Sequence, residues 1–305
     1  MNRDEIDALL SLPLAELLRR ADQARHEAVG DEIELCSIMN AKSGRCGEDC
    51  KFCAQSGRHA TGVATYPLKG KAEMLEAARR AQEIGAARFD IVTSGNRLTD
   101  NEVARIADAV DEITATLGMQ MCASLGRLSE ENLARLKRAG LSRYHHNIET
   151  SPAHYARIVT THPFAERLET IRAAQRVGLQ VCSGGIIGMG ETWADRIDMA
   201  LLLKELNVTA VPLNVLVPIP GTPFENMTPI ACADAVRTIA IFRLILRDKI
   251  IKIAAGRESV LKDFQAMAFL AGANGMLIGG YLTLRGRAAQ DDRGLVEEVK
   301  RAWRQ

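Results

Sequence analysis

Three of the 7 cysteines in this 305-residue chain, Cys46, Cys50 and Cys53, lie within eight positions of one loop. The surrounding stretch, SGRCGEDCKFCAQS, is rich in glycine and in charged or polar residues. Cysteines that serve only as core residues are expected on apolar faces instead. Closely spaced thiols in a polar loop are typical ligands of zinc or of iron–sulfur clusters, so the loop predicts a metal centre.

The number of thiols helps to distinguish between these two kinds of metal centre. A structural zinc ion takes four ligands, usually as two closely spaced pairs. The spacing here is C-x3-C-x2-C, and only His59 lies nearby as a possible fourth ligand. A [4Fe-4S] cluster held by three thiolates keeps one iron open for a cofactor. We therefore favour an iron–sulfur cluster over zinc.

Short β-rich runs alternate with amphipathic helical segments along the chain. The helical segments include 71–85, 129–140 and 164–178. In the second of these, Ser129 is the expected N-cap and Gly140 the expected terminator. Eight β–α units over roughly 250 residues predict an α/β fold of the (β/α)8 TIM barrel type, with an open doubly wound sheet as the alternative. We expect strands at Glu32–Ile38, Arg88–Thr93, Gln120–Ser124, Tyr144–Ile148, Gln180–Ile187, Ala210–Val217, Ile250–Ala254 and Gly275–Ile278.

No linker, low-complexity tract or internal repeat divides the sequence. We expect one domain over 1–305, with an N-terminal helical extension (1–30) and a C-terminal tail or helix (286–305). The 39 lysines and arginines nearly balance the 38 acidic residues, which argues against nucleic acid as a partner. The most apolar stretch, 266–282, is interrupted by Asn274 and glycines, so we expect no membrane span. Without a signal-peptide pattern, a cytoplasmic location is expected, where thiols stay reduced.

Further polar and thiol side chains fall within or just after the later predicted strands. The C-terminal ends of the strands of a TIM barrel meet at one face, where active sites lie. These side chains should therefore converge near the cysteine loop, and packing alone is a poor explanation for such convergence. The residues concerned are Cys122, Asn147, Glu149, Cys182, Asn214 and Arg257.

The cysteine loop resembles the cluster loop of radical S-adenosylmethionine (SAM) enzymes, and the longer stretch CSIMNAKSGRCGEDCKFCAQS resembles the biotin synthase family. The resemblance covers about residues 30–285. It implies a radical SAM barrel that converts dethiobiotin to biotin, the final step of biotin biosynthesis. Five further segments match in order: YHHNIETSP, VCSGGIIGMGET, VPLNVLVPIPGTP, AAGRES and AGANGMLIGGYLT.

The resemblance also implies roles for individual residues toward the first cluster and SAM. Cys46, Cys50 and Cys53 would hold the [4Fe-4S] cluster, whose open iron binds SAM. The backbone of Phe52 to Ala54 would contact the adenine, and the turn at Ser94 would line the methionine end. The remaining SAM contacts would be Arg167 to the carboxylate, and Asn147 and Glu149 to the nucleoside.

For the substrate, the resemblance places the ureido ring of dethiobiotin near Asn147 and Asn214, whose amides offer both a donor and an acceptor. His145 stands where the family often has asparagine, and it could donate a hydrogen bond there or serve only as a core histidine. Thr283 lies where the family contacts the tail carboxylate, and Leu284 replaces a second threonine.

Biotin synthases carry a second iron–sulfur cluster that donates sulfur, held by three cysteines and an arginine. Cys122, Cys182 and Arg257 match three of these ligands, but Asp90 stands where a cysteine is expected on the second strand. Cys36 lies on the neighbouring strand, and adjacent strands are only about 5 Å apart. We hypothesise that Cys36 supplies the missing thiolate, to a [2Fe-2S] or a larger cluster with a spare sulfide. The alternative is that Cys36 simply packs in the barrel.

Two other functions remain open from the sequence. A related radical SAM enzyme, such as a metallocofactor maturase or a mutase, would need the first three cysteines but no sacrificial cluster. A non-catalytic iron–sulfur or zinc protein would not explain the polar residues at the strand ends. The resemblance further implies a flavodoxin- or ferredoxin-like electron donor, the iron–sulfur assembly machinery as a partner, and a homodimer.

Overall fold

A parallel sheet that closes on itself forms the centre of the molecule in a computed structural model, which describes residues 3–283 and 286–304. The strand order is β5-β4-β3-β2-β1-β9-β8-β7-β6, and a bridge between Cys182 and Ala210 joins β5 to β7. Because β5 and β6 follow each other along one edge, they act as two halves of one barrel strand. The predicted (β/α)8 barrel is confirmed, and the open sheet is wrong.

The nine strands of the described residues fill the eight strand positions that the sequence predicts, because β5 and β6 share one position, but some bounds differ. The strand expected at Tyr144–Ile148 begins and ends three residues earlier, and the run expected at Gln180–Ile187 is broken. A Cβ at Gly184, inside that break, would lie 2.0 Å from the Pro212 carbonyl oxygen, so the backbone approaches β7 too closely for any side chain. The strands are β1 Glu34–Lys42, β2 Arg88–Thr93, β3 Gln120–Ser124, β4 Leu141–His145, β5 Gln180–Cys182, β6 Gly185–Ile187, β7 Ala210–Val215, β8 Ile250–Ile253 and β9 Gly275–Ile278.

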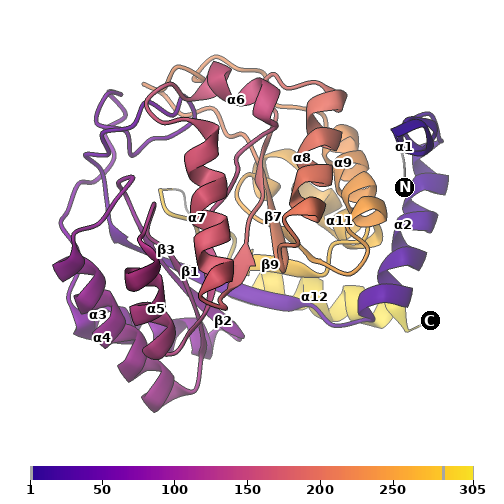
Figure 1. Ribbon diagram of the computed structural model, residues 1–305. Coiled ribbons are helices and arrows are strands. Elements are labelled where there is room, and N and C mark those ends of the chain that lie inside the picture. Colours follow the sequence, from indigo (N-terminus) through magenta and orange to yellow (C-terminus); the bar gives the residue numbers. More distant parts are fainter. Residues whose placement is uncertain (1–2, 284–285, 305) are drawn as a thin grey trace.

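Helices surround the barrel (Figure 1). In α5, the Ser129 hydroxyl accepts a hydrogen bond from the Asn132 amide at 3.3 Å, and Gly140 follows the helix with φ +103°, as the sequence predicts. The helices are α1 Arg3–Leu10, α2 Leu14–Val29, α3 Lys71–Glu83, α4 Asp100–Leu117, α5 Glu130–Arg138, α6 Pro152–Ile158, α7 Phe164–Arg176, α8 Trp193–Glu205, α9 Cys232–Ile245, α10 Arg257–Val260, α11 Gln265–Leu270 and α12 Ala289–Trp303, with a 3-10 turn at Lys262–Phe264.

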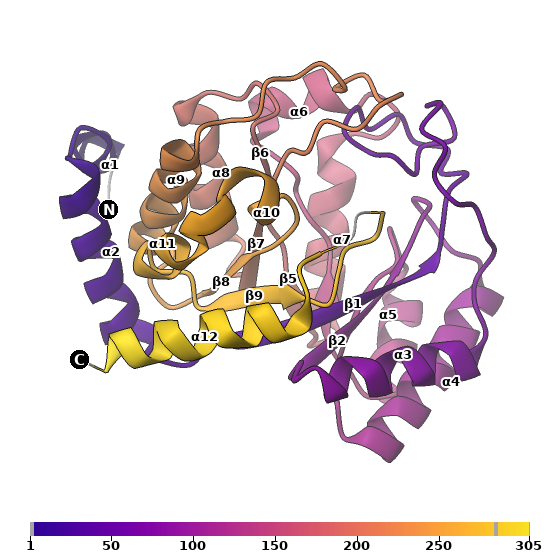
Figure 2. The same ribbon diagram turned by 180° about the vertical axis from the view of Figure 1, so that it is seen from behind.

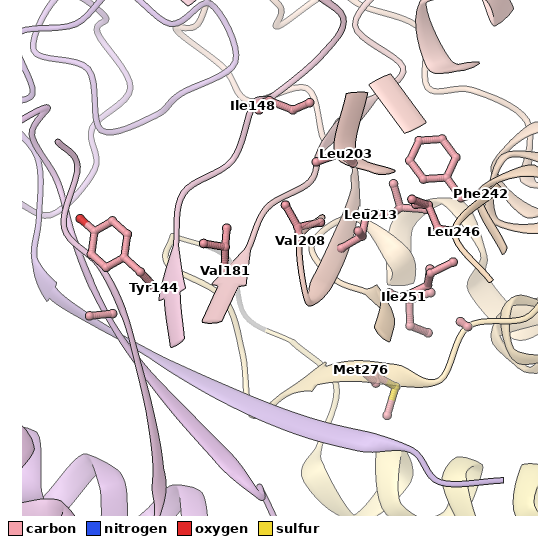
Figure 3. Close-up of a cluster of buried hydrophobic side chains, with 14 of the residues drawn as sticks. Tyr144, Ile148, Val181, Leu203, Val208, Leu213, Phe242, Leu246, Ile251 and Met276 are labelled. Carbon is pink, nitrogen blue, oxygen red and sulfur yellow. The ribbon is translucent and has the colours of Figure 1, made fainter. Parts of the chain in front are cut away.

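The hydrophobic core lies between the helices and the outer face of the barrel. Val181, Leu213 and Ile251 are buried on three strands, and Phe242 and Leu246 come from α9 and its C-terminal end (Figure 3). Successive side chains of a strand point to opposite faces. The apolar residues that pack outward therefore leave alternate positions for the thiols and charged residues inside the barrel.

The two ends of the chain pack against the outside of the barrel. Helix α2 lies against α9, and α12 crosses near β9 and β1 (Figure 2). The guanidinium carbon of Arg25 on α2 lies 3.6 Å from the ring centroid of Trp303 on α12, so the two terminal helices also touch each other. None of the helices in the described ranges is long and apolar enough to cross a membrane.

A buried ion pair fixes α12 to the barrel. Arg257 Nη2 donates to Asp292 Oδ2 at 2.6 Å, and both side chains are almost fully buried. Asp292→Ala would leave a buried guanidinium without this carboxylate, so we expect the free energy of unfolding to fall by about 3–5 kcal/mol. Urea unfolding followed by circular dichroism measures this change.

The matched control is Lys300→Ala on the same helix, because Lys300 pairs with the exposed carboxylate of Glu32. Exposed pairs contribute about 0–1 kcal/mol. Equal losses in the two variants would contradict the role given to the buried pair.

Candidate functional site

The strands and the loop after β1 enclose a cavity of about 390 Å³. Alternate residues of the strands face it, for example Cys36 and Ile38 on β1 and Cys122 and Ser124 on β3. All the thiols expected at the two clusters therefore meet in one space, as the barrel prediction required. They are Cys36, Cys46, Cys50, Cys53, Cys122 and Cys182.

The cysteine loop is held by its own backbone. The Cys46 amide donates to the Gln55 carbonyl at 3.0 Å, and the Cys53 amide donates to the Cys50 carbonyl at 2.9 Å. Gly44 precedes the loop with φ +73°, and a Cβ there would lie 2.4 Å from the Thr65 hydroxyl oxygen. The loop therefore presents its three thiols to the cavity from a closely packed backbone.

The chemistry of this loop fits a cluster better than a single ion. In the part of the chain that the structure describes, no three His, Cys, Asp or Glu side chains converge as they do around one metal ion. A cubane cluster binds each thiolate to a different iron, so thiols that line one cavity suffice. His59 does not line the cavity, and its Nδ1 lies 3.0 Å from the Cys53 carbonyl oxygen. Burial raises the pKa of Cys53 to about 11, so metal must displace a proton from that thiol.

Arg167 and Glu149 lie beside the cysteine loop. Arg167 Nε donates to the Tyr155 hydroxyl at 2.7 Å, Nη1 donates to the Asn147 carbonyl at 2.9 Å, and Nη1 lies 3.5 Å from Glu149 Oε1. Burial alone would lower the pKa of Arg167, but Glu149 and Tyr155 raise it. This pair brings one fixed positive charge and one carboxylate to the cavity wall next to Cys50.

The other residues expected to bind SAM divide into two groups. Phe52 and Ala54 line the cavity, as expected. Ser94 does not, because its buried hydroxyl donates to the Gly44 carbonyl at 2.8 Å. Its neighbours Thr93 and Gly95 line the cavity instead. The turn at Ser94 thus reaches the cavity through its neighbours, while Ser94 itself ties the end of β2 to the start of the cysteine loop.

The second group of thiols lies inside the barrel. Cys36, Cys122 and Cys182 are buried on β1, β3 and β5. Besides burial, Cys182 raises the pKa of Cys36, Cys36 raises that of Cys122, and Cys122 raises that of Cys182. Burial raises the pKa of Cys36 to about 11 and that of Cys122 and Cys182 to about 12. The structure thus brings the hypothesised ligand Cys36 to the same chamber as the two expected cysteines.

Arg257, in contrast, does not line the cavity. Its guanidinium binds Asp292 and Gln265 on the outer side of the barrel. The cation that does line the cavity is Lys252 on β8, two residues before the end of the apolar run IIKIA. The structure does not bring Arg257 to the cavity as the sequence analysis expected, because Arg257 sits at the start of a helix after the strand, whereas Lys252 occupies an inward position within the strand.

A hydrogen-bond chain of Asp90, His145 and Asn147 lines the cavity that contains both groups of thiols. His145 Nδ1 lies 2.9 Å from Asp90 Oδ2, and Nε2 lies 3.0 Å from Asn147 Oδ1. The Gly184 amide also donates to Asn147 Oδ1, which identifies this atom as the acceptor, so His145 Nε2 must donate to it. Burial alone would lower the pKa of His145, but Asp90 raises it. The other Asp90 oxygen, Oδ1, is buried and has no hydrogen-bond partner among the described residues.

The remaining residues expected at the substrate also line the cavity. Asn214 donates to the Gly185 carbonyl at 3.3 Å and accepts from the Ala255 amide at 3.1 Å, so its amide is held in one orientation. Thr283 lines the same cavity, and Leu284 lies outside the described residues. The Asn214 amide oxygen still has capacity for a second hydrogen bond.

Charged residues that the sequence analysis did not single out form the floor of the barrel. The Glu34 carboxylate binds Arg143 Nη1 at 2.8 Å and Lys252 Nζ at 2.6 Å, and it lies 3.5 Å from Arg88 Nε. Arg88 Nη1 also donates to the Cys122 sulfur at 3.7 Å. The only sequence signal for this floor is the presence of charged residues at inward positions of apolar strands.

Known proteins resemble the chain in both sequence and fold. A family model of the radical SAM superfamily matches residues 41–203, and a model of the biotin and thiamin synthesis associated domain matches 212–300. Biotin synthase of Thermotoga petrophila is 49% identical over 98% of this chain and 99% of its own. Biotin synthase of Thermotoga neapolitana is 52% identical over 88% of this chain and 96% of its own.

Two solved structures share the fold at low sequence identity. Methylornithine synthase (PylB) superposes with a TM-score of 0.84 at 20% identity, covering 99% of this chain and 92% of that one. The FeFe-hydrogenase maturase HydG from Carboxydothermus hydrogenoformans gives 0.79 at 19% identity, covering 97% and 77%. These two similarities concern the fold alone.

The Glu34 interactions predict a specific dependence of stability on pH. Burial alone would raise the pKa of Glu34, but Lys252 and Arg143 lower it from 4.5 to about 2. A lowered carboxyl pKa contributes stability above pH 4.5, which is lost as the pH falls toward 2. We expect Glu34→Gln to lower the free energy of unfolding by about 3 kcal/mol at pH 7 and by much less at pH 3, measured by urea unfolding.

Glu32→Gln is the matched control, because Glu32 is a nearby carboxylate that is almost fully exposed. We expect a change within about 0.5 kcal/mol at both pH values for this variant. A Glu34→Gln effect that does not diminish at low pH would show that shape, and not charge, matters at this position.

Proposed function

The chain belongs to the biotin synthase family of radical SAM enzymes, and on this premise we propose that it inserts sulfur into dethiobiotin to form biotin. Two groups of three thiols that line one cavity carry the proposal. A radical SAM enzyme of another function, such as a maturase or a mutase, requires only the first group. The second group of thiols is explained if the reaction needs another iron–sulfur cluster, as sulfur insertion does.

When bound, the [4Fe-4S] cluster and SAM supply the radical that removes hydrogen from saturated carbon, and a second cluster supplies the sulfur. Cys46, Cys50 and Cys53 hold the first cluster. Arg167 binds the SAM carboxylate, and its contacts to Tyr155 and the Asn147 carbonyl fix the guanidinium in place. Phe52 and Ala54 contact the adenine, and Glu149 and Asn147 contact the nucleoside.

Asn147, Asn214 and His145 bind the ureido ring of dethiobiotin between the two groups of thiols. Hydrogen bonds to the backbone hold the side-chain amides of Asn147 and Asn214 in one orientation, which lowers the entropic cost of binding the ureido ring. Thr283 reaches the tail carboxylate from the loop after β9.

Cys36, Cys122 and Cys182 hold the second cluster, a [2Fe-2S] unit or a larger cluster with a spare sulfide. Cys36 on β1 replaces the thiol that is absent at Asp90 on the neighbouring strand, where Ile38 pairs with Asp90. Asp90 is bound to His145 and is a harder ligand than a thiolate, which suits an iron–sulfur cluster less well.

The same proposal implies the location, the oligomeric state and the partners of the protein. We expect a single domain over 1–305 that acts in the cytoplasm as a homodimer, without nucleic acid or membrane partners. A flavodoxin- or ferredoxin-like protein donates the electrons, and the iron–sulfur assembly machinery loads the clusters.

One experiment tests both the reaction and the second ligand set. The protein is reconstituted without oxygen and given SAM, dethiobiotin and a strong reductant. Mass spectrometry then quantifies 5′-deoxyadenosine and biotin. We expect both products, with about one biotin per chain in a single turnover, because the bound cluster is the sulfur source. Deoxyadenosine without biotin would contradict the substrate assignment.

Cys36→Ala separates the two clusters in the same assay. This variant should still cleave SAM, lose biotin formation, and lose the iron and sulfide of the second cluster. Cys232→Ala, a thiol on α9 outside the cavity, is the matched control and should behave like the wild type. Full iron and sulfide content in Cys36→Ala would show that Cys36 is not a ligand.

A further inference from the structure

The chamber behind the second group of thiols contains more positive than negative charge. Arg88, Arg143 and Lys252 share the single carboxylate of Glu34, and all three cations are almost fully buried. The nearest other carboxylate, Asp90, is already hydrogen bonded to His145, whose pKa is raised. No other acidic side chain among the described residues lines this part of the cavity.

A buried cation without a full counter-charge is costly, so this arrangement favours a negatively charged occupant. Thiolates and sulfides bring such charge, whereas three protonated thiols do not. Arg88 directs Nη1 to the Cys122 sulfur at 3.7 Å, and its Nε has no hydrogen-bond partner among the described residues. Lys252 is the member of the floor that lines the cavity itself.

We propose that Lys252, supported by Arg88, is a positioning residue that stabilises the negative charge of the second cluster in the barrel. The inference rests on the proposed function, because it presupposes that Cys36, Cys122 and Cys182 hold a cluster. Lys252 acts through its charge and not as a ligand, since its ammonium group is bound to Glu34 at 2.6 Å. Reduction adds negative charge to a cluster, so a nearby cation makes reduction easier.

The test compares Lys252→Met, which removes the charge and retains the length, with Lys252→Arg, which retains the charge. The fully loaded proteins are titrated with reductant at controlled potentials, and EPR follows each cluster separately. We expect the ratio of reduced to oxidised second cluster at a fixed potential to fall about tenfold in Lys252→Met, a shift of about 59 mV to lower potential. Lys252→Arg should restore the wild-type ratio.

The first cluster is the internal control, and its titration should not change in either variant. Lys300→Met on α12 removes a distant lysine and should leave both clusters unchanged. If Lys252→Met loads only the first cluster while Lys252→Arg loads both, the charge is needed for binding, which also supports the proposal.

An unchanged reduction potential of the second cluster in Lys252→Met would overturn the inference. Equal loss of the second cluster in both variants would also overturn it, because the shape of the side chain and not its charge would then be responsible.

The proposed function would fail in a different way. Wild-type protein that holds only about four irons and forms no biotin would contradict the second cluster itself, and with it this inference.

Discussion

The Glu34 carboxylate is the interaction on which the arrangement inside the barrel depends. It joins β1 to cations on β2, β4 and β8, strands that approach it from both sides of the closed sheet. A carboxylate that accepts several charge-assisted hydrogen bonds in a buried site is held much more firmly than an exposed ion pair. The floor of the barrel is therefore fixed before any cofactor binds, and the thiols above it are presented from strands whose relative positions are set.

The alternation of side chains along the strands explains how one sheet serves both stability and chemistry. Outward positions such as Val181, Leu213 and Ile251 pack against the helices and supply the hydrophobic core. The inward positions can then carry thiols and charged side chains, whose burial elsewhere in the interior would cost free energy. Such groups persist only when each finds a partner, and the Asp90–His145–Asn147 chain and the Glu34 floor provide these partners.

The sequence was sufficient to predict the barrel, and the convergence of most candidate site residues on one cavity, for two physical reasons. First, the alternation of strands and helices along the chain determines the fold class. Second, the C-terminal ends of barrel strands meet at one face, wherever the exact strand bounds lie. Cys122, Asn147 and Asn214 therefore converged as expected, although the strand near Asn147 was misplaced by three residues.

The structure departs from the sequence-based expectations at residues whose role depends on the direction of one side chain. Arg257 and Lys252 are five residues apart, and β8 ends between them, so Lys252 points into the cavity from the strand while Arg257 begins the helix that follows. Ser94 likewise sits between two cavity residues but turns toward Gly44. A motif shows that an arginine or a serine is present. The direction of that side chain depends on where the strand ends, and strand ends are the feature that sequence patterns predict least well.

The two groups of thiols differ in the charges around them, although both are buried and both require deprotonation to bind metal. The first group has the Arg167–Glu149 pair beside it, in which one positive and one negative charge balance. The second group lies over three cations that share one carboxylate. In the proposed function a second cluster would give up a sulfide, and the excess of fixed positive charge would continue to stabilise the thiolates that hold it. The two groups of thiols thus share one cavity but differ in the fixed charges around them.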